Sequence, residues 1–225
     1  MSLSTDKYLF VDVETTGTSP ERHGLTQLSG CVQVGDDVKE YFDYFIRPFR
    51  EDVIEEEALK VTGFDRRQFL PENDPNCLKV DGQVFADPFE TFASFKELLA
   101  RYVDPYNKSD KLQFVGYNSH SFDMPFLRRF WEKNNDRFFG SWFWYPGLDV
   151  MLIWAQLLKD ERGQLPNFKL ATVAKHCGIE VEEDRLHDSR YDIDLTRELW
   201  LLACDRMRGA RPATEPAVQG SLFDF

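Results

Sequence analysis

The sequence predicts an α/β domain built on a mixed β-sheet that begins with an antiparallel meander. Three apolar segments rich in β-branched and aromatic residues come first, and only a short turn separates the second from the third. One further strand and several segments of helical periodicity follow. These observations predict a central sheet flanked by helices, and a length of 225 residues fits one domain with an extension.

The first predicted strand lies in KYLFVDVETTG, residues 7–17, and ends with two carboxylates. Side chains alternate between the faces of a strand, so Asp12 and Glu14 project to the same side. Two ionised carboxylates in a poorly hydrated place repel each other and lose hydration. A metal ion, a Lys or Arg partner, or a helix N-terminus is therefore expected beside them. In a chain with 39 acidic residues, such a pair also arises by chance and can simply face solvent.

Residues 27–36 and 38–48 predict the second and third strands, joined by a turn at Gly35-Asp36-Asp37 and closed by Pro48. Three adjacent strands with this early hairpin predict an antiparallel meander.

A short helix is predicted over residues 55–64, ending at Gly63. Residues 70–90 combine prolines, glycines and scattered charges, which is typical of a loop or an insertion. The segment 88–103 has apolar residues at helical spacing. Residues 111–119 predict a strand stopped by Gly116. Four helical segments follow it: residues 122–134, 147–160, 170–179 and 191–207.

The composition favours an ordered protein of the reducing cytoplasm. Hydrophobic residues make up 42% of the chain, enough for a core. The four cysteines lie far apart without C-x-x-C spacing, so we expect buried thiols rather than a zinc site. The sequence has neither an apolar run of roughly 20 residues nor the basic start of a signal peptide, so no membrane association is expected.

The net charge of −12 argues against nucleic acid as a partner, because phosphate binding usually leaves a basic footprint. The objection weakens if divalent cations neutralise several carboxylates and if binding is confined to a short single strand. A partner that supplies DNA contacts would fit such a protein.

A second acidic stretch, VGYNSHSFDMPFL, ends a strand at Gly116 and offers Asn118 and His120 before Asp123. Asp123 lies near a helix start, where the helix dipole favours its charge. A helix cap for Asp123 and a solvated loop position for His120 are the alternatives to a functional role.

The richest stretch is LHDSRYDIDLTREL. Asp188 precedes the last helix by the step that a cap requires. Asp192 lies four residues later on the same face, so the two charges repel unless a cation lies between them. His187, just outside the helix, can reach the site that Asp192 faces and can accept a proton from water near neutral pH. A loop histidine without function is the alternative.

Three stretches, in chain order, resemble the three motifs of the DEDD 3′–5′ exonucleases: DVETTG, GYNSHSFDMPFL and HDSRYD. The H-D-x-x-x-D form is typical of the histidine branch, to which bacterial proofreading subunits and RNase T belong. Three further segments, ALKVTGF, GLDVMLIW and KLATVAKHCGI, resemble accessory helices of that family. The resemblance spans residues 7–203 and implies a ribonuclease H-like fold. Tyr117 and Ser189 differ from the common family residues, and neither is a required ligand.

The resemblance implies that Asp12, Glu14, Asp123 and Asp192 bind two divalent cations. Four carboxylates suit Mg²⁺ or Mn²⁺. Two such ions about 3.5–4 Å apart stabilise the attacking and leaving oxygens of an in-line displacement. His187 would take the proton from the attacking water, and the product would be a nucleoside 5′-monophosphate.

The resemblance also places substrate contacts at Thr15, Thr16, Asn118 and Phe122. Thr16 can instead simply end the strand, and Phe122 fits the core as well as it fits a wedge against a base. The aromatic cluster at residues 137–147 is interpreted as core and a rigid turn rather than as a base-stacking platform.

The domain is predicted to cover residues 1–208, and residues 209–225 form a flexible C-terminal tail. Gln219, Leu222 and Phe223 in this tail resemble the short peptides that bind the bacterial sliding clamp. An end that packs on its own domain or stays disordered is the alternative.

The sequence therefore predicts a metal-dependent 3′–5′ exonuclease acting on single-stranded DNA 3′ ends in replication proofreading or repair, with a DNA polymerase as a further candidate partner. An exoribonuclease is the nearest alternative, because the motifs do not reveal a preference for the 2′-hydroxyl. A catalytically silent interaction module of the same fold is the other. The presence of all four acids and His187 argues against silence.

Overall fold

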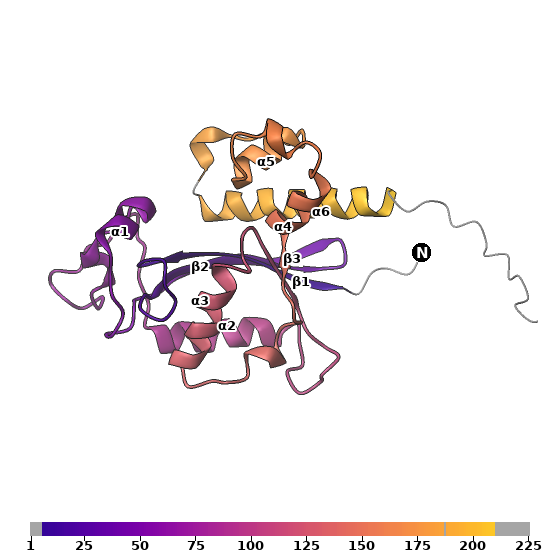
Figure 1. The fold of residues 1–225 in the computed structure, drawn as a ribbon. Helices are drawn as coiled ribbons and strands as arrows, with labels where there is room; N and C mark the ends of the chain where they lie inside the picture. The colour runs from indigo at the N-terminus through magenta and orange to yellow at the C-terminus, as the bar shows by residue number, and fades with distance from the viewer. Residues whose placement is uncertain (1–5, 187, 210–225) are drawn as a thin grey trace, which may run out of the picture.

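The computed structural model of the protein describes residues 6–186 and 188–209. They form a five-stranded sheet with helices on both faces (Figure 1). The strands are β1 (Lys7–Thr15), β2 (Leu25–Val34), β3 (Asp37–Phe45), β4 (Gln113–Gly116) and β5 (Leu148–Asp149), in the order β3-β2-β1-β4-β5. The pairs β1–β2 and β2–β3 are antiparallel, whereas β1–β4 and β4–β5 are parallel. The predicted mixed sheet with an initial meander is confirmed.

Two groups of helices enclose the sheet. The helices are α1 (Glu56–Thr62), α2 (Pro88–Ala100), α3 (Asp123–Lys133), α4 (Val150–Leu157), α5 (Leu170–His176) and α6 (Ser189–Gly209). Short 3₁₀ turns occupy Arg66–Phe69, Phe139–Ser141, Arg162–Gln164 and Glu183–Arg185. Helices α2 and α3 cover one face, and α4, α5 and α6 cover the other (Figure 1). No helix in these described ranges is long and apolar enough to cross a bilayer.

β1 separates two apolar cores. Leu9, Val11 and Val13 pack into the core on the side of α2 and α3. Phe10 belongs to the core beneath α6, together with Ile193 of that helix. Because strand side chains alternate, Asp12 and Glu14 follow Phe10 onto the α6 face. The sequence prediction that the two carboxylates share one side of the strand is therefore confirmed.

Several predicted helix boundaries differ from the structure by two or three residues. The segment predicted as a helix from residue 147 begins with β5, and helix α4 starts only at Val150. The last helix starts at Ser189, two residues before the predicted start, because Asp188 caps it. It ends at Gly209, one residue into the predicted tail.

The predicted loop at residues 70–90 contains no helix or strand before Pro88. Gly63 ends α1 in a left-handed conformation with φ 73°, as predicted. All four cysteines are free, but only Cys31 is buried. The prediction of buried thiols is wrong for the other three, which are partly exposed, although Cys177 and Cys204 pack against the core beneath α6.

The core on the side of α2 and α3 gives a direct test of this packing. Trp131 of α3 is fully buried, with its ring 4.9 Å from that of Phe92 and 5.3 Å from that of Phe139. Trp131→Ala should lower the free energy of unfolding by about 3–5 kcal/mol, because the cavity cannot close completely. Phe138→Ala, at a 64% exposed side chain, should change it by less than about 0.5 kcal/mol. Urea denaturation followed by circular dichroism measures both, and equal losses would contradict the described core.

Candidate active site

The carboxyl end of β1 extends beyond its parallel neighbour. The β1–β4 pairing runs only from Tyr8 to Phe10, so the N–H of Val13 has no partner in β4. The carboxylate of Asp123, the first residue of α3, accepts a hydrogen bond from this N–H at 3.1 Å. Asp123 is buried, with 4% of its surface exposed. The first and second acidic motifs are thus joined by a direct hydrogen bond.

The third motif reaches the same place through α6, which carries Asp192 in its first turn. Burial raises the pKa of Asp12 well above its ordinary value, and the charges of Asp123, Glu14 and Asp192 raise this pKa further. The fold therefore brings the four predicted carboxylates within electrostatic reach of one another.

Asp123 is affected in the same direction. Burial raises its pKa to about 7, although the backbone N–H groups of Asp123 and Val13 act in the opposite sense. The charges of Asp149 and Glu14 contribute to the rise. Two carboxyl groups of this cluster are thus costly to ionise in the protein alone.

The donor set fits a hard divalent cation. Within the described ranges, no three His, Cys, Asp or Glu side chains already converge as a metal-binding group. Carboxylates that repel one another are expected to stand apart until a cation draws them together. All four groups offer carboxylate oxygen, the ligand that Mg²⁺ and Mn²⁺ prefer. A cation would also offset the burial and the charges that raise the pKa of Asp12.

The start of α6 is fixed by Asp188. Its carboxylate accepts hydrogen bonds from the N–H groups of Arg190 at 3.0 Å and Tyr191 at 3.2 Å. The predicted capping role is confirmed. His187 lies outside the described residues, so its assignment as a general base stays a prediction.

Asp149 is a residue of this region that sequence reasoning missed. Its buried carboxylate accepts from the N–H groups of Asn118 at 3.0 Å and His120 at 3.1 Å, and from Met151 at 3.0 Å in the first turn of α4. Asp149 therefore ties the loop that precedes Asp123 to α4. An Asp directly before an apolar helical run is a capping pattern, and this was the available signal.

Of the four predicted substrate residues, Thr15 and Thr16 use their hydroxyls in hydrogen bonds within the protein. The hydroxyl of Thr15 donates to the carbonyl of Gly17 at 2.7 Å. The hydroxyl of Thr16 donates to the carbonyl of Val53 at 2.6 Å, and this side chain is fully buried. These hydroxyls stabilise the turn after β1, so a nucleotide would meet backbone there. Their predicted role remains untested.

Asn118 is exposed and has a left-handed φ of 60°. Phe122 is partly buried against the core on the side of α2 and α3, with its ring 5.0 Å from that of Phe126. Both substrate roles stay predictions.

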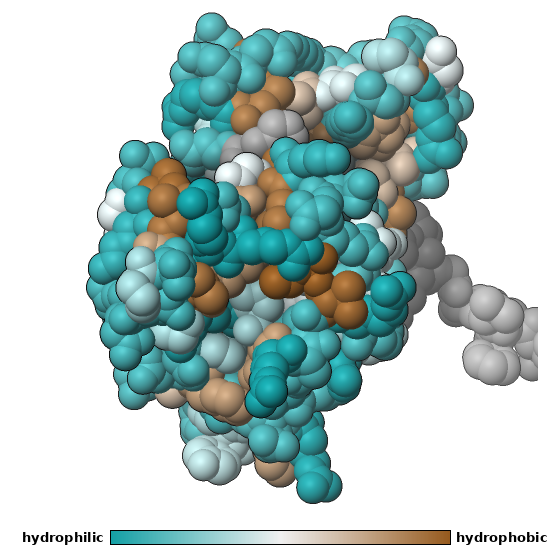
Figure 2. All heavy atoms as spheres, turned by 90° about the vertical axis from the view of Figure 1, so that its left-hand side faces the viewer, coloured by the Kyte–Doolittle hydropathy of each residue, from teal (hydrophilic) through white to brown (hydrophobic). Residues whose placement is uncertain are grey.

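A cavity of about 330 Å³ opens beside Glu14. Its walls come from β1, β2, β3, α1, residue 83 and the start of α6. The side-chain amide of Gln27 donates to Asp43 at 2.8 Å and to Ser189 at 3.2 Å, which joins β3 to α6. Figure 2 looks at the molecule from the side of α1 and shows apolar residues interrupting a mainly hydrophilic surface.

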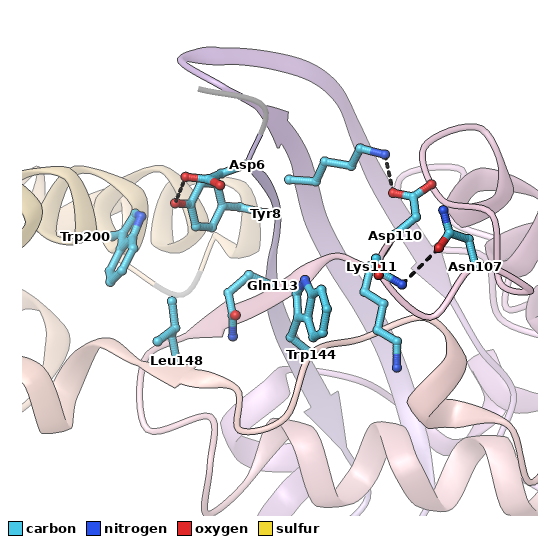
Figure 3. Close-up of a pocket in the computed structure, with 11 residues that line it drawn as sticks. Asp6, Tyr8, Asn107, Asp110, Lys111, Gln113, Trp144, Leu148 and Trp200 are labelled. Carbon is cyan, nitrogen blue, oxygen red and sulfur yellow. Dashed lines mark hydrogen bonds and ion pairs between the residues drawn. The ribbon is translucent and has the colours of Figure 1, made fainter. Parts of the chain in front are cut away.

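A larger cavity of about 650 Å³ lies at the amino end of β1 (Figure 3). Tyr8, Trp144 and Trp200 contribute aromatic rings to it. Among its charged groups, Lys7 binds Asp110 at 2.5 Å, and Lys111 lies over the ring of Trp144. None of the predicted site residues lines this cavity, so cavity size does not identify the active site here.

The aromatic cluster contributes to both core and surface. Phe139, Trp142 and Phe143 are buried, as predicted, whereas 42% of Trp144 and 79% of Tyr145 are exposed. The core interpretation is correct for Phe139, Trp142 and Phe143 and wrong for Phe138, which is 64% exposed; Trp144 and Tyr145 belong to the turn that follows the contact of Phe143 with Leu112.

Comparisons with known proteins agree with this geometry. No family model matches the chain. A protein of Escherichia coli described as the 3′–5′ DNA exonuclease Cap18 is 28% identical over 198 residues, which are 87% of this chain and 93% of that protein. E. coli exonuclease I in complex with a dT13 oligonucleotide superimposes on 90% of this chain with a TM-score of 0.64 and 20% identity. Product-bound exonuclease I gives 0.65 and 18% over 91% of the chain. The chain is similar in sequence to a 3′–5′ DNA exonuclease and in fold to exonuclease I.

The extent of these similarities differs. The chain spans only 41% of the exonuclease I chain, but nearly the whole of Cap18. At 20% identity the likeness to exonuclease I shows the fold, and it confirms the predicted ribonuclease H-like fold. The predicted resemblance to 3′–5′ exonucleases is confirmed, whereas the histidine branch stays a prediction.

The raised carboxyl pKa values predict an unusual pH dependence of stability. Because the pKa of Asp123 in the folded protein lies above its unfolded value of about 3.9, the metal-free protein should lose stability as pH rises from about 4 to about 7. Asp123→Asn keeps an acceptor for the N–H of Val13 and removes the charge. In EDTA at pH 8 it should raise the free energy of unfolding by about 1–3 kcal/mol.

Below about pH 4 the same substitution should have little effect, because the wild-type carboxyl is then protonated in both states. Asp160→Asn, at an exposed position, serves as the control and should be neutral at both pH values. Urea titrations at pH 4 and pH 8 measure the difference. A destabilised Asp123→Asn variant at pH 8 would refute the electrostatic description.

Proposed function

We propose that this chain is a metal-dependent 3′–5′ exonuclease that hydrolyses single-stranded DNA and releases nucleoside 5′-monophosphates. The observation that carries the proposal is that four carboxylates from three separate segments lie within electrostatic reach of one another at the carboxyl end of β1. Partly buried like charges cost folding free energy, so their retention in one place is best explained by a cation that the protein uses.

In this proposal Asp12, Glu14, Asp123 and Asp192 hold the divalent cations. The bound cations would neutralise charge at the scissile phosphate and on the attacking and leaving oxygens. The hydrogen bond from Val13 keeps the Asp123 carboxylate at the end of β1. His187 takes the proton from the attacking water, next to the helix start that Asp188 fixes.

Single-stranded DNA is the proposed substrate because the relative that covers most of the chain is described as a 3′–5′ DNA exonuclease. Exonuclease I, which shares the fold, has been crystallised with dT13. The net charge of −12 favours contact with a short stretch of strand over a long phosphate track.

Replication proofreading or repair, with a DNA polymerase or sliding clamp as partner, remains a narrower proposal. It depends on Gln219, Leu222 and Phe223, which lie outside the described residues.

The four acids can be tested by substitution. Asp12→Ala, Glu14→Ala, Asp123→Ala and Asp192→Ala should each lower the rate at least about 10²-fold, because each removes a ligand of the proposed cations. The assay follows the product ladder from 5′-labelled single strands of DNA and matched RNA with Mg²⁺ or Mn²⁺. Asp160→Ala is the control and should keep the wild-type rate. Wild-type rates in any two of the four variants would refute the metal assignment, and faster RNA cleavage would favour the exoribonuclease alternative.

The role of His187 has a separate signature. His187→Ala should lower kcat by about 10²–10⁴-fold, the usual range for loss of a general base. It should leave Mn²⁺ affinity, measured by calorimetry, almost unchanged. The wild-type rate should fall as pH drops through the ordinary histidine range, and the variant should lose this dependence. His120→Ala removes an exposed imidazole nearby and should retain both rate and pH profile. Equal pH profiles for wild type and His187→Ala would instead support a loop histidine without catalytic function.

A further inference from the structure

The segment between Phe69 and Pro88 contributes one polar side chain, Gln83, to the cavity beside Glu14. The volume of about 330 Å³ lies at the small end of the range for ligand pockets, about 300–1,000 Å³, and suits a single nucleotide. The lining combines carboxylates with the apolar side chains of Phe45 and Phe64. A nucleotide whose phosphate lies at Glu14 would therefore extend its base among apolar walls and Gln83.

The backbone is fixed on both the N-terminal and the C-terminal side of Gln83. Its N–H donates to the carbonyl of Val80 at 2.9 Å, and Asp81 and Gly82 between them have φ values of 51° and 74°. This is the pattern of a tight turn with two left-handed residues. Two residues later, Phe85 is buried, with its ring 5.1 Å from that of Phe64.

The backbone after Phe85 is also attached to the sheet. The N–H of Ala86 donates to the carbonyl of Phe45 at 2.9 Å, and the N–H of Arg47 donates to the carbonyl of Ala86 at 2.9 Å. The backbone at Gln83 is thus held in place before any ligand arrives, so only its side chain has to be ordered when a ligand binds.

The side chain of Gln83 is half-buried, and no hydrogen bond joins it to any residue in the ranges 6–186 and 188–209. The other amide of this cavity, that of Gln27, already binds Asp43 and Ser189. A carboxamide offers two donor hydrogens and an acceptor oxygen. It can therefore pair with a molecule in the cavity that presents both kinds of group.

We infer that Gln83 is a specificity-determining residue that hydrogen-bonds the base of the 3′-terminal nucleotide. The inference rests on the proposed function and names a feature of its substrate. A carboxamide forms its best two-point contact with adenine, which presents an amino group beside a ring nitrogen. The enzyme should therefore prefer a 3′-terminal adenine.

The experiment compares single-stranded DNA oligonucleotides that differ only in the 3′-terminal nucleotide: adenine, thymine, cytosine or an abasic residue. Removal of this one nucleotide is followed with wild type, Gln83→Ala and the remote control Gln164→Ala, an exposed glutamine of the 3₁₀ turn Arg162–Gln164. Thermal unfolding checks that each variant folds.

For wild type and Gln164→Ala, KM should be lowest with terminal adenine. Gln83→Ala should raise KM about 3–10-fold on this substrate, as expected for loss of one or two hydrogen bonds, and change kcat by less than about twofold. On the abasic substrate, wild type and Gln83→Ala should have equal KM. Gln83→Glu keeps the size and an acceptor but loses the donors, so it should shift the preference from adenine toward cytosine.

The inference is overturned if active wild type shows the same KM ratios as Gln83→Ala, or if Gln83→Ala raises KM equally on the abasic substrate. Absence of nuclease activity in wild type with Mg²⁺ or Mn²⁺ would instead refute the proposed function.

Discussion

Carboxylates on the buried face of a central strand are the constraint on which this structure depends. β1 lies between β2 and β4 and packs apolar side chains on both faces, yet Asp12 and Glu14 follow Phe10 on the α6 side. The sheet accommodates them by ending β4 at Gly116, so that its next loop can turn across the strand end. A Cβ at Gly116 would lie 3.0 Å from the carbonyl oxygen of Val11 and 2.7 Å from Ser119, so only glycine allows this approach.

That approach explains the electrostatics of the site. Once the loop lies close, Asp123 can accept the hydrogen bond from Val13, but its charge then adds to those that already disfavour ionisation of Asp12. Local stability is lowered where function is proposed, and the apolar packing of β1 on both sides supplies the compensation. A cation at this point would therefore act as part of the fold as well as of the chemistry.

Sequence reasoning succeeded where the causes are local. Alternation along β1 placed Asp12 and Glu14 together, and capping logic identified Asp188, because both depend on neighbours in the chain. It failed where partners are distant. β5 has only two residues and exists because Leu148 and Asp149 pair with β4, so no periodicity reveals it. The cavity beside Glu14 combines five strands or helices with Gln83 from a segment whose composition indicates only a loop. The substrate roles of Thr15 and Thr16 were drawn from motif position and stay predictions; the hydroxyl of Thr15 donates to Gly17 two residues away, and that of Thr16 donates to the distant Val53.

The acidic surface makes the small cavity more important. With a net charge of −12, the chain repels a phosphate backbone outside the proposed metal site, so long electrostatic contacts cannot supply affinity. The larger cavity adds little free positive charge, because its Lys7 is paired with Asp110 and its Lys111 lies over the ring of Trp144. Under the proposed function, recognition would be concentrated on the end of the strand, where bound cations would meet the phosphate and the cavity beside Glu14 would receive the nucleotide. An exonuclease of the proposed kind would distinguish an end from an interior segment by geometry, since a terminal nucleotide could enter a cavity of about 330 Å³ without drawing the rest of the strand along an acidic surface.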